Sequence, residues 1–189
     1  MEQLRTFIAV DIKPENDLLQ SWDDLKANLC QDKIKWVDNE LMHLTLFFLG
    51  DTPEVKINGL MQSIDGSLFS IKSFSLIIKG LGCFGNPLSP KVIWAGIEIS
   101  NNLLKLKECI NSAVIPLGFN EEEREFKPHL TLGRVKEMKP SGKFKNSIEN
   151  YKTKVFQESK VTNVVLYQSI LRQNGPIYKP LRIFKLPSL

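Results

Sequence analysis

The stretch His43–Gly50, HLTLFFLG, carries a tetrapeptide that returns in the second half of the chain as His129–Leu132, HLTL. The 189-residue chain contains two histidines, and each opens one copy, 129 − 43 = 86 residues apart. Histidine is the one side chain whose ordinary pKa, about 6.5, allows it to give or take a proton near neutrality. The repeat therefore predicts a paired acid and base.

Both copies are expected to lie on β-strands. Residues 44–49 are rich in β-forming side chains, and the turn-forming sequence GDTP of residues 50–53 follows them. Successive strand side chains point to opposite faces. The histidine and threonine should therefore share one face with Phe47, while the leucines and Phe48 should share the other, buried face.

Two such strands facing each other would surround a tetrahedral phosphorus with two imidazoles and two hydroxyls. One neutral histidine then accepts a proton from the attacking water or hydroxyl, and the other, protonated, donates one to the leaving oxygen. Thr45 and Thr131 would hold the charged phosphoryl oxygens. A single His-x-Thr-x is more often structural, so the prediction depends on the pair.

Three other chemistries fit less well. A metal site would need further ligands near the motifs, and none lies at chelating spacing. A serine or cysteine nucleophile would need a surround such as GxSxG. Residues 80–85, GLGCFG, fit GxGxxG but precede a strand-like run, so we expect a loop there. We expect neither metal nor cofactor.

The composition is that of an ordinary globular protein, with 42% hydrophobic and 24% charged residues. The net charge of +4 permits a polyanionic partner but does not require one. Cys30, Cys83 and Cys109 are odd in number and lack CxxC spacing, which argues against disulfides and zinc. We see no signal peptide and no apolar run near the ~18 residues of a membrane span. We expect a cytoplasmic monomer without membrane or obligatory protein partners.

The apolar periodicity predicts an α+β fold. Adjacent strands with turn-rich connections favour antiparallel sheets, and the repeat suggests two lobes that each contribute one motif strand to a shared cleft. The expected strands are 6–12, 44–49, 74–78, 92–99, the second motif, 161–171 and 181–186, with residues 34–37 leading toward the first motif strand and a loop over 80–90. The expected helices begin at 14–15 and at 53–54 and cover 102–113 and 144–151.

The chain resembles the 2H phosphoesterases, which are defined by two His-x-Thr-x motifs. It is most similar to the bacterial and archaeal RNA 2′,3′-cyclic phosphodiesterases, also called 2′-5′ RNA ligases. The similar segments follow in order along nearly the whole chain: 5–10 (RTFIAV), 36–37 (WV), 41–50 (LMHLTLFFLG), 92–96 (VIWAG), 126–134 (FKPHLTLGR), and 175–178 (GPIY) with 181. Met42 stands where the family more often has Asn.

The resemblance implies a single domain over residues 1–189. Its two lobes would each hold an antiparallel sheet with flanking helices, related by pseudo-twofold symmetry around a central cleft. It also implies hydrolysis of terminal 2′,3′-cyclic phosphates on RNA to 2′-phosphomonoesters. In that reaction His43 would protonate the departing 3′ oxygen and His129 would activate water. This order comes from the family, since the two motifs are symmetric.

Five further residues are candidates for substrate binding: Arg134, Phe7, Trp36, Tyr178 and Lys127. Arg134 follows the second motif, but strict alternation places it on the leucine face, so a solvated surface arginine is an alternative. Phe7 and Trp36 would stack on bases, or pack in the core. Tyr178 adds a hydroxyl, and Lys127 adds positive potential near the second motif.

Two alternatives to this function stay open. One is another 2H activity, either 2′-5′ RNA ligation or cleavage or the opening of a small cyclic nucleotide, with the same four motif residues. The other is a non-catalytic module that binds nucleotides or RNA. In every case the expected partners are RNA ends or cyclic nucleotides.

Overall fold

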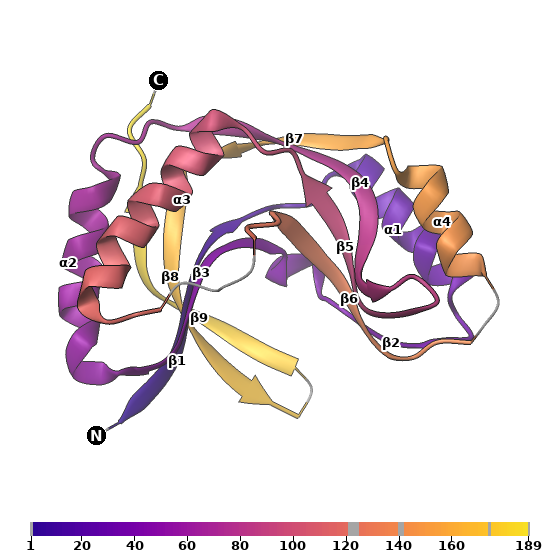
Figure 1. Cartoon of the computed structure of the whole chain (residues 1–189), viewed down its shortest axis with the longest axis horizontal. Coiled ribbons are helices and arrows are strands. Elements are labelled where there is room, and N and C mark those ends of the chain that lie inside the picture. Colours follow the sequence, from indigo (N-terminus) through magenta and orange to yellow (C-terminus); the bar gives the residue numbers. More distant parts are fainter. Residues whose placement is uncertain (1, 121–124, 140–141, 174, 189) are drawn as a thin grey trace.

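The strands and helices follow the apolar spacing of the chain in a computed structural model that describes residues 2–120, 125–139, 142–173 and 175–188 (Figure 1). The strands are β1 (Gln3–Asp11), β2 (Lys33–Trp36), β3 (His43–Pro53), β4 (Phe74–Asn86), β5 (Ser89–Ile97), β6 (His129–Glu137), β7 (Val155–Val161), β8 (Asn163–Arg172) and β9 (Gly175–Lys185). The helices are α1 (Asn16–Asn28), α2 (Ile57–Leu68), α3 (Asn101–Val114) and α4 (Lys143–Tyr151), with the 3₁₀ turns η1 (Asn39–Leu41), η2 (Glu54–Lys56) and η3 (Ile115–Leu117).

The strands pair antiparallel throughout the described residues, in the order β7-β4-β5-β6-β3-β1-β8-β9, with β2 paired to β6. This confirms the α+β prediction. The two predicted sheets are halves of one curled sheet, because the motif strands β3 and β6 pair at Leu44 and Leu130. We call β1, β3, β8 and β9 the β3 half, and β2, β4, β5, β6 and β7 the β6 half. The pseudo-twofold symmetry stays a prediction.

Each half of the sheet has its own pair of helices (Figure 1). Helices α2 and α3 pack on each other and on β9 and β3, whereas α1 and α4 contact β7 and β4. Helix α1 buries Leu18, Trp22 and Leu25 at helical spacing. Helix α3 begins at an N-cap, Ser100, whose hydroxyl accepts a hydrogen bond from the Leu103 amide at 3.2 Å. In the described part of the chain, no helix has the length and hydrophobicity to cross a bilayer.

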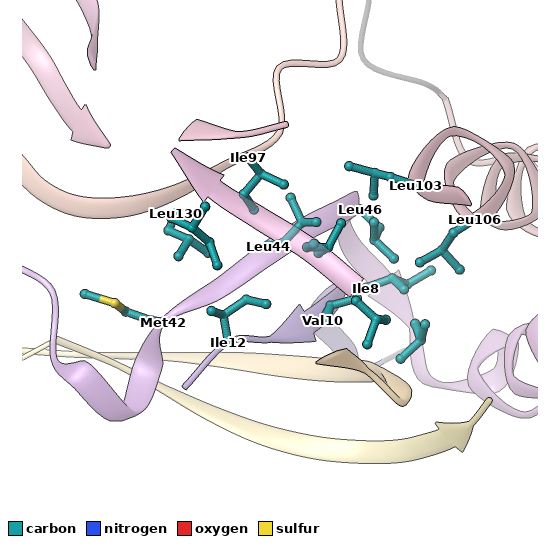
Figure 2. Close-up of a cluster of buried hydrophobic side chains, with 14 of the residues drawn as sticks. Ile8, Val10, Ile12, Met42, Leu44, Leu46, Ile97, Leu103, Leu106 and Leu130 are labelled. Carbon is teal, nitrogen blue, oxygen red and sulfur yellow. The ribbon is translucent and has the colours of Figure 1, made fainter. Parts of the chain in front are cut away.

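An apolar layer lies behind the motif strands (Figure 2). Leu44 and Leu46 of β3 and Leu130 of β6 are at most 2% exposed. Leu46 lies toward Leu103 and Leu106 of α3, and Leu130 lies toward Met42. Truncation of such a leucine to alanine costs about 2–5 kcal/mol of folding free energy. Because a one-residue slip would move these leucines into water, the layer fixes which side of each strand faces away from the core.

Each motif strand bulges at the same place. In β3 the extra residue relative to β1 is Leu46, and in β6 the extra residue relative to β5 is Leu132. Both are the final leucine of the tetrapeptide. A bulge shifts the in-and-out alternation of the residues that follow it by one position.

The bulge in β3 corrects one prediction. Phe47 was expected to lie beside the histidine and Phe48 in the core, but Phe47 is 4% exposed and Phe48 is 38% exposed. The extra residue exchanges their faces. The equivalent bulge in β6 moves Arg134 off the leucine face, where strict alternation had placed it.

The predicted loop over residues 80–90 was also wrong. Strand β4 continues to Asn86 and forms a hairpin with β5, so the GxGxxG segment lies within a strand. At Gly82 an added Cβ would lie 2.1 Å from the Trp94 ring, so the glycine makes room for an aromatic side chain. Strand β7 was not predicted, because its polar residues QES give little strand signal, and β8 begins two residues later than expected.

Candidate active site

The four motif side chains line one cavity of about 1220 Å³. His43 and Thr45 reach it from β3, and His129 and Thr131 from β6. Antiparallel pairing of Leu44 with Leu130 sets a register in which each histidine lies across from the threonine of the other strand. Two distant tetrapeptides thus meet around a common space.

Both imidazoles are anchored in the same way. His43 Nδ1 lies 2.7 Å from the Leu41 carbonyl oxygen, and His129 Nδ1 lies 2.7 Å from the Lys127 carbonyl oxygen. A carbonyl oxygen only accepts hydrogen bonds, so Nδ1 donates in each case and carries a proton. Nε2 is therefore the nitrogen able to exchange a proton with a substrate.

The surroundings of His43 pull its pKa in opposite directions. Burial lowers the pKa of His43 most, the Leu41 carbonyl and the Asp11 carboxylate raise it, and His129 and Arg134 lower it. The net pKa lies below the ordinary value of 6.5. A bound anionic phosphate would add negative charge and so favour the protonated ring.

Aromatic rings pack around His43, and of the two alternatives for Phe7 its burial favours packing in the core. The centroids of the Phe7 and Tyr178 rings each lie 5.1 Å from that of His43. Tyr178 lines the cavity, whereas Phe7 is 4% exposed and packs behind the imidazole. The rings of His43, Tyr167 and Tyr178 surround Phe7, which is not among the cavity-lining residues.

His129 also packs against rings. Phe84 of β4 meets it edge-on at 4.8 Å between ring centroids, and Trp94 of β5 lies 6.3 Å away. Phe84 lines the cavity. Phe84 was not among the predicted site residues, because it falls in the segment expected to be a loop.

The other predicted residues, Trp36, Lys127 and Arg134, line the cavity as Tyr178 does. The Trp36 ring packs over Gly133, where an added Cβ would lie 2.9 Å from it. Lys127 Nζ lies 3.8 Å from a Glu125 carboxylate oxygen. Their roles toward a substrate stay predictions.

Phe48 is a lining residue that the sequence analysis placed in the core. It stands five positions after His43, as Arg134 does after His129. A comparison of equal offsets in the two repeats would have paired these residues. The Arg5 guanidinium lies 4.9 Å from the centre of the Phe48 ring.

Cations outnumber carboxylates among the described lining residues. The cations are Lys35, Lys107, Lys127 and Arg134, and the carboxylates are Asp38 and Glu125. Lys35 of β2 and Arg134 of β6 lie directly opposite each other. Like charges across neighbouring strands are unfavourable unless an anion offsets them, so this wall is suited to a phosphate.

Residues 2–120, 125–139, 142–173 and 175–188 contain no group of three histidine, cysteine or acidic side chains placed to hold a metal ion. Cys30, Cys83 and Cys109 are thiols, and burial raises the pKa of the latter two. The groups that line the cavity, two imidazoles beside two hydroxyls and a cationic wall, are suited to proton transfer at a phosphate.

Comparisons with known proteins agree with this geometry. Residues 7–186 match the family of the AKAP7 2′5′ RNA ligase-like domain. An RNA 2′,3′-cyclic phosphodiesterase of Thermotoga maritima is 38% identical over 178 residues, 94% of this chain and 93% of that protein. One of Archaeoglobus fulgidus is 33% identical over 183 residues, 96% and 100% of the two chains. The crystal structure of TT0787 of Thermus thermophilus superposes with a TM-score of 0.80 at 26% identity, covering 98% of this chain and 99% of that one. As its motifs predicted, the chain belongs to the AKAP7 2′5′ RNA ligase-like domain family and is a 2H phosphoesterase.

Proposed function

We propose that this protein is an RNA 2′,3′-cyclic phosphodiesterase that opens terminal cyclic phosphates to 2′-phosphomonoesters. The observation that carries the proposal is the convergence of two His-Thr pairs, from β3 and β6, on one cavity. Relatives that share 33% and 38% of their residues with this chain over nearly its whole length bear this name.

The reaction is an in-line displacement at phosphorus. His129 Nε2 accepts a proton from water as the water oxygen forms a bond to phosphorus. The bond from phosphorus to the 3′ oxygen breaks, and His43 Nε2 donates its proton to that oxygen. One water is consumed, and each histidine ends in the protonation state opposite to the one in which it began. Thr45 and Thr131 donate hydrogen bonds to the non-bridging oxygens, where charge accumulates.

The rest of the cavity supports an RNA end as the substrate. Its volume of about 1220 Å³ is far larger than one phosphate needs. Its lining combines aromatic side chains, among them Trp36, Phe48 and Phe84, with the four cations named above. Proteins that bind single strands combine such features, because any base stacks on an aromatic ring and cations follow the backbone.

The test is product analysis on an RNA oligonucleotide that ends in a 2′,3′-cyclic phosphate, in excess EDTA. We expect a mass gain of one water and a single 2′-phosphate signal in ³¹P NMR. The matched control is the chain with both His43→Ala and His129→Ala. A 3′-phosphate product, or equal turnover by the control, would contradict the proposal. A ligated or 2′-5′-cleaved product would indicate the other 2H activities, and tight binding without product a binding module.

We further propose that the enzyme acts as a cytoplasmic monomer in which both lobes belong to one domain. Light scattering at micromolar concentration should give a mass near 21.6 kDa. Thermal unfolding should show one cooperative transition, since both lobes share the core behind the motif strands. Two transitions would indicate separate domains.

A further inference from the structure

A carboxylate stands next to His43 on the neighbouring strand. Asp11, the last residue of β1, is the cross-strand partner of His43 in β3. On its other side β1 pairs with β8, which carries Tyr167. The Tyr167 hydroxyl lies 2.8 and 2.7 Å from the two carboxylate oxygens of Asp11. Because a carboxylate only accepts, Tyr167 donates, and Asp11 is held between two strands.

Packing fixes the Tyr167 ring independently of its hydroxyl. The ring stacks on Phe7 at 5.3 Å between centroids, with 22° between the ring planes. Phe7 is buried and also contacts His43 at 5.1 Å. Burial, followed by Asp11, raises the pKa of Tyr167, so its hydroxyl keeps its proton at neutral pH. The donor is thus rigid and always protonated where it meets Asp11.

We propose that Asp11 and Tyr167 are positioning residues for His43, in which Tyr167 holds the Asp11 carboxylate beside the imidazole and the carboxylate favours the protonated ring. This inference rests on the proposed function, in which His43 is the proton donor. Burial, Arg134 and His129 all act against the protonated form of His43. Asp11 is the carboxylate that opposes them.

The proposal predicts which side of the pH profile moves. As the proton donor His43 must be protonated, so kcat/KM falls as the pH rises through its pKa. Removal of the Asp11 charge lowers that pKa and moves the alkaline limb to lower pH. If His43 were the base, the acidic limb would move instead.

The direct test is an NMR titration of the folded protein. The chain has two histidines, so each imidazole gives its own curve, and His43→Asn identifies which is which. We expect Asp11→Asn to lower the His43 midpoint by about 1 pH unit, since loss of a nearby carboxylate removes a charge that favours the protonated imidazole. Tyr167→Phe keeps the ring and should shift it in the same direction by less.

Two matched variants serve as controls. Asp51→Asn removes the same charge from the same strand pair, at the end where Asp51 faces Arg5. Tyr151→Phe removes another hydroxyl that bonds an aspartate, Asp24, at 3.3 Å, outside the cavity. Neither should move the His43 titration. Circular dichroism of all four variants checks that they are folded.

An unchanged His43 midpoint in both Asp11→Asn and Tyr167→Phe would overturn the proposal, even if the protein hydrolyses cyclic phosphates. A shift in the controls of the same size would also overturn it, because the effect would then be one of net charge. If the titration moves but no cyclic phosphate is opened, the positioning pair stands and the proposed function fails. The two ideas are therefore tested separately.

Discussion

The motif strands β3 and β6 carry the same tetrapeptide and repeat the same local geometry. In each strand the histidine Nδ1 donates to the carbonyl two residues earlier, at 2.7 Å. In each, the final leucine of the motif forms a bulge. The identical tetrapeptides thus adopt the same backbone geometry. Any difference between the two histidines in acid or base function must therefore come from the residues around them.

Those neighbours differ at matching positions. The residue across from His43 is Asp11 of β1, whereas the residue across from His129 is Gly96 of β5. Five residues after each histidine, β3 presents Phe48 and β6 presents Arg134. The carboxylate comes from β1 and the ring from β3 itself, whereas β6 itself carries the cation. These unequal neighbours are the structural difference on which the proposed acid and base roles of the two histidines depend.

The largest effect should come from the histidines. His43→Ala and His129→Ala should each lower kcat/KM on a 2′,3′-cyclic phosphate by about 10³-fold. A phosphodiester with a 4-nitrophenolate leaving group needs no protonation of that group. Its hydrolysis should be largely retained in His43→Ala and lost in His129→Ala, as followed by absorbance. Equal losses on this substrate would break the proposed division of labour.

The threonines should give the next largest effect. Thr45→Val and Thr131→Val each remove one donor to the phosphoryl oxygens at nearly constant volume, and each should lower kcat by about 10²-fold. Thr→Ser at the same positions keeps the donor and should retain most activity. Steady-state kinetics on one cyclic dinucleotide compares all four variants. Wild-type kcat in either valine variant would remove that threonine from the mechanism.

The two residues at the fifth position should give smaller and different effects. Arg134→Gln should raise KM about tenfold and reduce its dependence on salt, because one phosphate contact is lost. Phe48→Leu should raise KM about fivefold for substrates that carry a base, because one stacking contact is lost. Its KM should depend on salt as that of the wild type does. KM at several salt concentrations separates the two. The same salt dependence of KM in both variants would contradict the assignment of a phosphate contact to Arg134 and a base contact to Phe48.

The smallest expected effect is on stability. Burial first of all lowers the pKa of folded His43 below its ordinary 6.5, so the unfolded chain binds more protons as the pH falls below 6.5. The contribution of neutral His43 to folding stability is fully present above pH 6.5 and is lost as the pH falls through the pKa of the folded protein. Between pH 7.5 and 5.5 the wild type should lose about 1–2 °C more in Tm than His43→Asn. Parallel Tm curves would show that folding leaves this pKa unchanged.

Several features followed directly from the sequence. Apolar alternation around both motifs predicted strands with one buried face, and Leu44, Leu46 and Leu130 are buried as expected. Helical spacing predicted the buried face of α1. These signals are local, because a side chain's direction along a regular strand or helix depends on its position in the sequence.

Other features were decided by residues far apart in the sequence. The bulges depend on how β3 and β6 pair with β1 and β5, and they exchange the faces of Phe47 and Phe48. Phe7 is an ordinary aromatic residue in the sequence, and its contact with the His43 ring follows from the pairing of β1 with β3.

The sequence by itself determined the chemical groups of this protein: two histidines and two threonines on strands with a buried leucine face, in an antiparallel α+β fold. Only the tertiary structure decided what stands beside each histidine. Asp11 and Tyr167 are 156 residues apart, and they meet because their strands, β1 and β8, are paired in the sheet. The physical reason is that a strand's own pattern fixes which face is buried, whereas cross-strand pairing fixes the electrostatic surroundings of each side chain.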